Sequence, residues 1–242
     1  MARTAVIAGV GPGLGASLAR RFAAEGCAVA LLARTESFLE DLASDLDEGP
    51  GAGLAVPTDL RDADAIRDAF ETVRAELGPV DVLVNHASAS AWEGLRGCSV
   101  EAFDEALAVG PRAGFVASKE AAADMLGETP GADADGGTII FTGATTAVRG
   151  RAGAVDFSAA KFGVRGLAQS MAQELGPEGV HVAHVVLDGG ILPPDRDVDD
   201  PESYLDPDDI ADAYWDLVET DGVATMSFEV HVTNGNGTVE FL

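Results

Sequence analysis

The stretch that decides the fold reads Thr4-Ala-Val-Ile-Ala-Gly9-Val-Gly-Pro-Gly13-Leu-Gly15 and lies at the start of the chain. The apolar run predicts a buried strand, and the glycines after it predict a tight turn that opens a helix. Glycines let the backbone approach a bound group closely, and a helix N-terminus offers free N–H groups to phosphate. This order therefore predicts a dinucleotide pyrophosphate site formed by Gly9, Gly11, Gly13, Leu14 and Gly15.

Apolar runs and amphipathic stretches alternate along the rest of the chain. The segments that we interpret as strands are Thr4–Gly9, Ala28–Ala33, Leu54–Val56, Val80–Asn85, Thr138–Thr142, Val180–Leu187 and Thr225–Val232. The segments with a helical pattern are Gly13–Glu25, Glu36–Asp47, Asp62–Glu76, Val100–Val109, Arg112–Met125, Gly153–Leu175 and Pro207–Glu219. Such alternation predicts βαβ units and a parallel sheet. Because no linker interrupts it, we expect residues 1–242 to form a single dinucleotide-binding domain of the Rossmann type.

Acidic residues dominate the charge of the chain. Asp and Glu total 41 against 15 Lys and Arg, which gives a net charge of −26. A diffuse acidic surface repels phosphate, so we expect no nucleic-acid partner. Such a surface stays soluble where salt screens the repulsion, and it resembles the surfaces of proteins from high-salt cytoplasms. We therefore expect a halophilic protein, with a basic protein partner as the alternative reading of the charge.

The sequence also bears on location and on metal binding. It contains no apolar run of about 18 residues, the length of a membrane span. Its first residues lack the features of a signal peptide, so we expect a cytoplasmic protein with no membrane partner. The two cysteines, Cys27 and Cys98, provide neither a disulfide framework nor a zinc spacing. We expect no catalytic metal.

Several segments resemble the short-chain dehydrogenase/reductase family, and the resemblance covers nearly the whole chain. Gly9, Gly13 and Gly15 match the family's G-x-x-x-G-x-G turn, and Phe157-Ser-Ala-Ala-Lys161 occupies its Tyr-x-x-x-Lys position. The resemblance implies a doubly wound parallel sheet of seven strands, in the order 3-2-1-4-5-6-7, with helices on both faces. It also implies a bound nicotinamide cofactor. The positions that would contact it beyond the glycine turn are Asp59, Leu60, Asn85, His86, Ala87, Thr142, Lys161, Asp188, Gly189 and Ile191.

The end of the second predicted strand bears on the choice between NADP and NAD. An acid there would accept hydrogen bonds from the ribose hydroxyls and favour NAD. Here the strand ends in Ala33-Arg34, with Ala33 at the position of the acid. The Arg34 guanidinium could pair with a 2′-phosphate, so we expect NADP and keep NAD as the alternative. Arg34 could instead stack on the adenine or pair with Glu36.

The catalytic pattern of the family is incomplete in this chain. In the family a tyrosine is the general acid/base, a lysine lowers its pKa, a serine orients the carbonyl and an asparagine supports a water relay. Lys161 matches the lysine, whereas Phe157, Ala144 and Gly110 stand at the tyrosine, serine and asparagine positions. Carbonyl reduction needs a proton donor for the developing alkoxide. We therefore expect ordinary Ser-Tyr-Lys carbonyl reduction to be lost or strongly reduced.

Other polar groups could supply the missing proton. His86 follows the fourth strand near the cofactor and belongs to a residue type that titrates near neutrality, although a structural histidine is the alternative. Tyr204 could reach the site from the long segment Asp188–Asp206. The Phe157 pattern resembles an uncharacterised branch of the family, and some family members reduce conjugated double bonds with a rearranged site.

These observations lead to two main functional hypotheses. The first is an NAD(P)-dependent oxidoreductase with an altered proton-donor site and an unknown small-molecule substrate. The second is a catalytically inactive NADP-binding protein that acts as a sensor or as a subunit of an assembly. A structural protein without any cofactor is disfavoured by the intact glycine turn.

The family resemblance also bears on assembly and on the substrate pocket. Family members form dimers or tetramers through two long helices, which correspond here to Arg112–Met125 and Gly153–Leu175. We expect a homo-oligomer, a tetramer or a dimer. The substrate pocket is walled by Asp188–Asp206 and Ala87–Arg96, and neither segment carries a recognisable specificity signature.

Overall fold

The structure is a computed structural model that describes residues 2–194, 196–219 and 227–235. Its strands are β1 (Thr4–Ala8), β2 (Ala28–Ala33), β3 (Ala52–Pro57), β4 (Val82–Asn85), β5 (Gly137–Thr142), β6 (Val180–Asp188) and β7 (Glu229–Thr233). Its α-helices are α1 (Leu14–Ala24), α2 (Glu36–Leu46), α3 (Ala63–Glu76), α4 (Val100–Leu107), α5 (Ala113–Met125), α6 (Val155–Leu175) and α7 (Pro207–Val218).

The strands form one parallel sheet in the order β3-β2-β1-β4-β5-β6-β7, which confirms the predicted topology. The register pairs Ala8 with Asn85 and Asn85 with Phe141, so the carboxyl ends of β1, β4 and β5 lie at one edge. The strand order reverses between β1 and β4. In open α/β sheets the ligand site lies at this edge and at this reversal.

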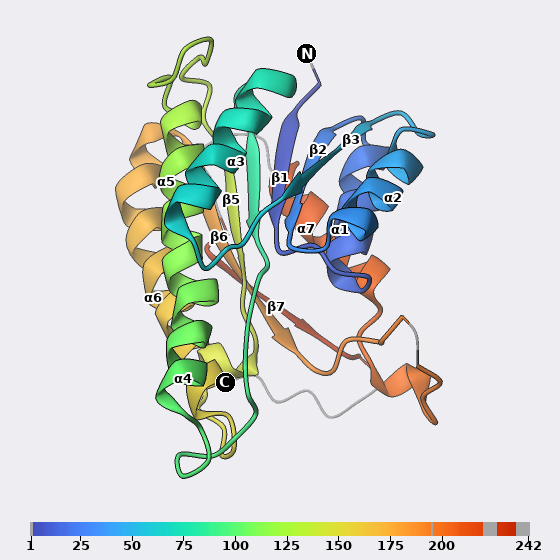
Figure 1. Cartoon of the computed structure of the whole chain (residues 1–242), viewed down its shortest axis with the longest axis vertical. Coiled ribbons are helices and arrows are strands. Elements are labelled where there is room, and N and C mark those ends of the chain that lie inside the picture. The colour runs from blue at the N-terminus through green and yellow to red at the C-terminus, as the bar shows by residue number, and fades with distance from the viewer. Residues whose placement is uncertain (1, 195, 220–226, 236–242) are drawn as a thin grey trace.

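Helices cover both faces of the sheet, as Figure 1 shows with α1, α2 and α7 on one side and α3, α5 and α6 on the other. Successive strand residues point to opposite faces. The five inner strands are almost entirely buried because both faces are covered, whereas the edge strands β3 and β7 are mostly half-buried. One apolar core joins the sheet to α1, α2 and α7, and a second joins it to α3, α5 and α6.

The helical path between α4 and α5 is unbroken, whereas the sequence predicts a gap between Val109 and Arg112. A π-helical turn spans Ala108–Arg112 and contains Pro111. Proline has no N–H to donate, and a wider turn accommodates its ring within a helix. Gly110 lies in this turn, where an added Cβ would come within 3.4 Å of the Ala160 Cβ on α6.

Several strand boundaries differ from the prediction by one or more residues, among them those of β3 and β7. β3 begins at Ala52 instead of Leu54, because Gly53 lets the strand pack directly against α2: a Cβ on Gly53 would lie 2.5 Å from the Ala43 Cα. The strand predicted over Thr225–Val232 starts in residues outside the described part, and β7 itself begins at Glu229. No helix of the described residues is long and apolar enough to cross a bilayer.

Candidate active site

Two adjoining cavities open at the carboxyl edge of the sheet. The first, which we call the glycine-turn cavity, has a volume of about 510 Å³ and is lined by the turn between β1 and α1. The second, which we call the Lys161 cavity, has a volume of about 810 Å³ and lies over the end of β5 and the start of α6. Both are lined by His86, Ser88 and Ile191, so the two cavities meet at these residues.

The glycine turn is shaped to admit a bound group. Gly9 has a φ of +106°, and a Cβ there would lie 2.5 Å from the Ala87 backbone, so this position requires glycine. A Cβ on Gly11, in contrast, would meet nothing within 4 Å. Helix α1 begins with no capping side chain and no acid in its first turn. Its positive N-terminal end therefore faces the cavity ready to bind an anion.

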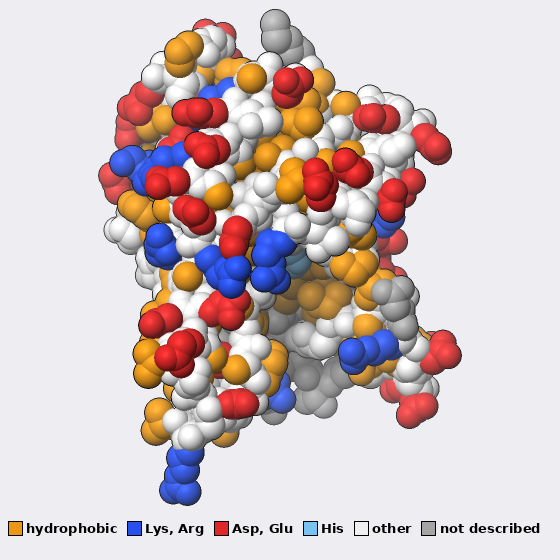
Figure 2. All heavy atoms as spheres, in the orientation of Figure 1, with side chains coloured by type: hydrophobic (Ala, Val, Ile, Leu, Met, Phe, Trp, Pro, Cys, Tyr) orange, Lys and Arg blue, Asp and Glu red, His pale blue; other side chains and the backbone are white. Residues whose placement is uncertain are grey.

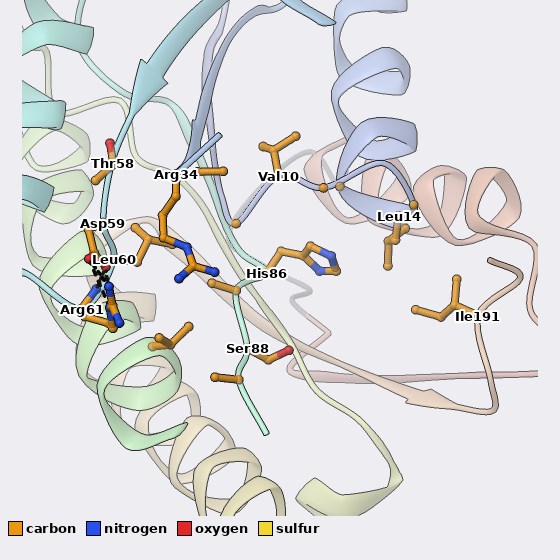
Figure 3. A pocket seen from close by; sticks show the side chains of 18 of the residues that line it. Val10, Leu14, Arg34, Thr58, Asp59, Leu60, Arg61, His86, Ser88 and Ile191 are labelled. Carbon is orange, nitrogen blue, oxygen red and sulfur yellow. Dashed lines mark hydrogen bonds and ion pairs between the residues drawn. The ribbon is translucent and has the colours of Figure 1, made fainter. Parts of the chain in front are cut away.

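The adenosine side of the glycine-turn cavity carries charged residues. The Arg61 guanidinium donates to the Asp59 carboxylate at 2.7 Å, and these hydrogen bonds lower the pKa of Asp59 to about 2. Arg34 makes no ion pair within the described part of the chain, so the predicted alternative of a pair with Glu36 is not realised. Figure 3 shows its side chain reaching into the cavity between Leu60 and His86.

Thr142, the last residue of β5, joins three other side chains at the junction of the cavities. The Lys161 ammonium donates to the Thr142 carbonyl at 2.7 Å. The Tyr214 hydroxyl of α7 donates to Thr142 Oγ1 at 2.8 Å, and His86 Nδ1 lies 3.1 Å from the same oxygen. These contacts fix the positions of His86 and Lys161 relative to the end of β5.

The Thr142 hydroxyl is shared between Tyr214 and His86. Tyr214 is fully buried, and Thr142 is its one hydrogen-bond partner among the described residues, so the tyrosine proton points at Thr142 Oγ1. A hydroxyl has one proton and two lone pairs, so Thr142 either donates to His86 Nδ1 or accepts from it, according to the tautomer of His86.

Burial changes the protonation of both basic groups at the junction. Desolvation, followed by the nearby charge of Lys161, lowers the pKa of His86 to about 4. Desolvation lowers the pKa of Lys161 to about 8. At neutral pH His86 is therefore a neutral imidazole, while Lys161 keeps its charge but gives up a proton more readily than an exposed lysine.

Two of the three positions where the family pattern fails lie at the Lys161 cavity. Phe157 and Ala144 line it, and the Lys161 ammonium lies 5.5 Å from the centre of the Phe157 ring. Gly110 lines neither this cavity nor the glycine-turn cavity and packs against α6 instead.

The remaining predicted cofactor residues divide between the cavities and the core. Asp188 and Gly189 line the Lys161 cavity, and the Thr145 hydroxyl donates to Asp188 Oδ1 at 2.5 Å. Asn85 lines neither of the two cavities. Its amide nitrogen donates to Ser118 Oγ at 3.0 Å, which gives it the role of joining β4 to α5.

Sequence reasoning missed several residues of the site. It did not place Tyr214 at the site, because Tyr214 is 72 residues from Thr142 along the chain and no sequence motif links the two. It also passed over Arg149 and Arg151, which line the Lys161 cavity together with Trp92. Tyr204 packs on Gly190 and does not line the Lys161 cavity. Within the described residues, no three His, Cys, Asp or Glu side chains are arranged to hold a metal ion.

Comparison with known proteins agrees with this geometry. The family model for short chain dehydrogenases matches residues 3–193. The chain belongs to this family. A curated relative, the D-threitol dehydrogenase of Mycolicibacterium smegmatis, is 29% identical over 180 residues, which are 74% of this chain and 67% of the relative. The probable galactose dehydrogenase of Rhizobium meliloti is 31% identical over 194 residues, 78% of this chain and 72% of the relative.

Solved structures of the family have the same architecture. A blue fluorescent protein from a metagenomic library, in complex with NADPH, has a TM-score of 0.84 at 28% identity and covers 96% of this chain and 97% of its own. A metagenomic short-chain oxidoreductase in complex with NADP has a TM-score of 0.81 at 28% identity and covers 96% of both chains. The family predicted from the sequence is thus confirmed.

Proposed function

We propose that this protein is an NADP-dependent oxidoreductase whose proton donor is not a tyrosine. The observation that carries the proposal is that the glycine-turn cavity, with Arg34 at one side, adjoins the cavity that holds Lys161 and shares His86, Ser88 and Ile191 with it. The curated relatives named above are dehydrogenases, and two structural neighbours are complexes with NADP or NADPH.

The residues of the first cavity fit such a cofactor. The open space at Gly11 and the uncapped start of α1 suit a pyrophosphate. Arg34 has no acidic partner among the described residues and would pair with the 2′-phosphate that distinguishes NADP from NAD. The nicotinamide end would then reach His86 and Ile191, where the cavities meet.

When bound, the nicotinamide ring supplies or accepts a hydride, and the protein must handle the accompanying proton. Phe157 has no proton to give. The lowered pKa of Lys161, about 8, suits a general acid at neutral pH. We assign the proton at the substrate oxygen to the Lys161 ammonium. In the tautomer that carries its proton on Nε2, neutral His86 would hold the same oxygen by a hydrogen bond, which changes its role from the proton donor expected from the sequence.

This assignment also fits a change in substrate type. Without the tyrosine and the serine, the site offers fewer donors to a carbonyl oxygen than the family pattern does. Reduction of a conjugated carbon–carbon double bond adds a proton to carbon. It therefore depends less on hydrogen-bond donors to a carbonyl oxygen than carbonyl reduction does. Both carbonyl compounds and enones therefore belong in a test of the activity.

The experiment is a turnover assay that follows NADPH consumption with matched panels of carbonyl compounds and enones. We expect consumption with at least one class, and its loss in Lys161→Met. The other lysine, Lys119, lies on the surface of α5, so Lys119→Met is the matched control. Tight binding of NADPH without turnover of either class would instead support the inactive sensor or assembly subunit.

A further inference from the structure

One wall of the Lys161 cavity is a stack in which two aromatic rings lie between two cationic groups. The Arg151 guanidinium lies 5.9 Å from the centre of the Trp92 ring. The Trp92 ring lies 5.0 Å from the Phe157 ring at an angle of 38°, and Lys161 lies on Phe157 in turn. All four residues line the cavity. Phe157 therefore contributes its ring to the wall, although it lacks the hydroxyl of the family's tyrosine.

The backbone at Trp92 is held in an unfavourable conformation. Its φ is +53°, in the left-handed region that bulky residues rarely adopt. The buried carboxylate of Asp156 accepts the Ala91 N–H at 2.7 Å and the Ser90 hydroxyl at 3.3 Å, and Ser90 Oγ accepts the Trp92 N–H at 3.1 Å. Strain that is enforced by its surroundings is typical of functional sites. The half-exposed Trp92 ring is thus held at the cavity mouth by several contacts.

The distribution of ion pairs marks out the arginines of this cavity. The chain carries 41 acids and 15 bases, thirteen of them arginines, and seven of these arginines have an acidic partner among the described residues. The paired arginines are Arg3, Arg20, Arg21, Arg61, Arg67, Arg74 and Arg165. Arg149 and Arg151 line the cavity, yet neither has an acidic oxygen within 4.0 Å among the described residues. In so acidic a protein, two unpaired guanidinium groups at one cavity indicate an anionic ligand.

Among the described residues, Asp188 is the only acid that lines this cavity, against three basic side chains, Arg149, Arg151 and Lys161. One Asp188 carboxylate oxygen accepts a hydrogen bond from the Thr145 hydroxyl at 2.5 Å. The overall charge of −26 repels anions from the rest of the surface. To bind an anion, Arg149 and Arg151 therefore have to attract it more strongly than the rest of the protein repels it. An uncharged substrate would need no such attraction.

We propose that the substrate is a molecule with a flat apolar body and an anionic group, a carboxylate or a phosphate, held by Arg149 and Arg151. Guanidinium groups bind both anions through paired hydrogen bonds. The apolar body would lie on Trp92 and Phe157, and the reacting end would face Lys161. The cavity volume of about 810 Å³ is within the range of small-molecule sites. This inference rests on the proposed function, because it takes the Lys161 end of the cavity as the place of reaction.

The test compares two fluorescent dyes that share a ring system and differ in charge: 8-anilinonaphthalene-1-sulfonate and uncharged N-phenyl-1-naphthylamine. Each is titrated into the full chain, with and without saturating NADP. We expect the sulfonate dye to bind at least about tenfold more tightly than the neutral dye. In Arg149→Gln/Arg151→Gln the preference should disappear while the affinity for the neutral dye stays the same, which also shows that the cavity is still folded.

The charge-matched double variant Arg20→Gln/Arg67→Gln, on the exposed surfaces of α1 and α3 and outside the cavity lining, should keep the full preference. Equal affinity of the wild-type protein for the two dyes, or a preference that survives in the double variant, would overturn the proposal. A parallel titration with NADPH distinguishes a failure of the proposed function from a failure of the proposed anion site. Failure of NADPH to bind, with the dye preference intact, would count against the proposed function and leave the anion site standing.

Discussion

Phe157 illustrates how one side chain can lose a chemical role and keep a structural one. Its ring packs between Trp92 and the Lys161 ammonium at 5.0 and 5.5 Å. Removing the hydroxyl leaves Lys161 with no phenol whose pKa it could lower. The lysine itself is then the ionisable group whose pKa, about 8, is best placed to exchange a proton at neutral pH.

The pH dependence of turnover tests this assignment. Reduction requires the ammonium form of Lys161, so kcat/KM should be constant at neutral pH and fall as the pH rises through about 8. No inflection should occur near 6.5, because the pKa of His86 is lowered to about 4. A profile with an inflection near 6.5 that His86→Phe removes would contradict the assignment and return the proton to His86.

Arg34 should determine the choice of coenzyme. Arg34→Ala removes a charge-assisted contact with the 2′-phosphate, worth about 2 kcal/mol or about 30-fold in affinity. We expect that loss for NADPH and little change for NADH, measured by fluorescence titration. Arg20→Ala, which removes an exposed charge from α1, is the matched control. An equal loss of affinity for NADPH and NADH would contradict this and indicate that Arg34 stacks on the adenine, which both coenzymes contain.

At the scale of elements, the strands could be predicted because nearly every one is a continuous apolar run. β3 is the instructive exception. Its first residues follow Gly-Pro-Gly51, a pattern that predicts a turn. The structure extends the strand to Ala52 because α2 packs so closely that Gly53 has no room for a side chain. Sequence periodicity cannot reveal that contact, since it depends on how two elements approach each other.

The close approach of α2 and β3 leads to a stability prediction. In Gly53→Ala the new Cβ would lie 2.5 Å from the Ala43 Cα and 2.6 Å from its carbonyl oxygen. Overpacking against backbone should lower the free energy of unfolding by about 2 kcal/mol or more. Gly49→Ala, whose Cβ would be at an ordinary 3.5 Å from the Leu46 carbonyl oxygen, should change it little. Denaturant unfolding of both variants checks this, and equal stabilities would contradict the packing argument.

The cofactor half and the substrate half of the site differ in how far they could be predicted. The glycine turn and Arg34 lie in contiguous motifs at the ends of β1 and β2, so the sequence places them. Tyr214 and Trp92 reach the site only through tertiary contacts, Tyr214 from α7 and Trp92 from the loop after β4. The sequence predicts that the segment Ala87–Arg96, which contains Trp92, walls the pocket, but no spacing rule links Tyr214 or the Trp92 ring to Lys161.

At the scale of the whole molecule, charge is the dominant feature. Figure 2 shows acidic side chains scattered over the visible face, with basic side chains gathered beside the hollow at its centre. With a net charge of −26, unscreened repulsion opposes the compact state. The number of acids therefore bears on stability, while the proposed role of the unpaired Arg149 and Arg151 is in ligand binding.

Salt should stabilise the protein if its surface is adapted to high ionic strength. We expect the melting temperature to rise steadily between about 0.1 and 3 M KCl, because screening weakens the repulsion. Sucrose at the same osmolality is the control, since it stabilises by exclusion without screening charge. A melting temperature that KCl and sucrose raise equally would count against adaptation by charge screening.

The exposed face of α5 and α6 should join copies of the chain. Phe115 and Phe162 are 53% and 45% exposed on these two helices. We expect the wild-type protein to exceed the monomer mass of 24.7 kDa in light scattering. Phe115→Glu/Phe162→Glu should yield monomers, while Leu95→Glu, at an exposed position outside these two helices, should not. A wild-type protein that runs as a monomer would contradict the expected oligomer.

The central claim is that the glycine-turn cavity binds NADP with its nicotinamide end beside the Lys161 cavity. The most direct measurement is energy transfer from tryptophan to reduced coenzyme, because Trp92 lines the Lys161 cavity and the chain has only two tryptophans. The account predicts saturable quenching of tryptophan emission, a matching rise in coenzyme emission, and tighter binding of NADPH than of NADH. No saturable signal with either coenzyme would contradict it.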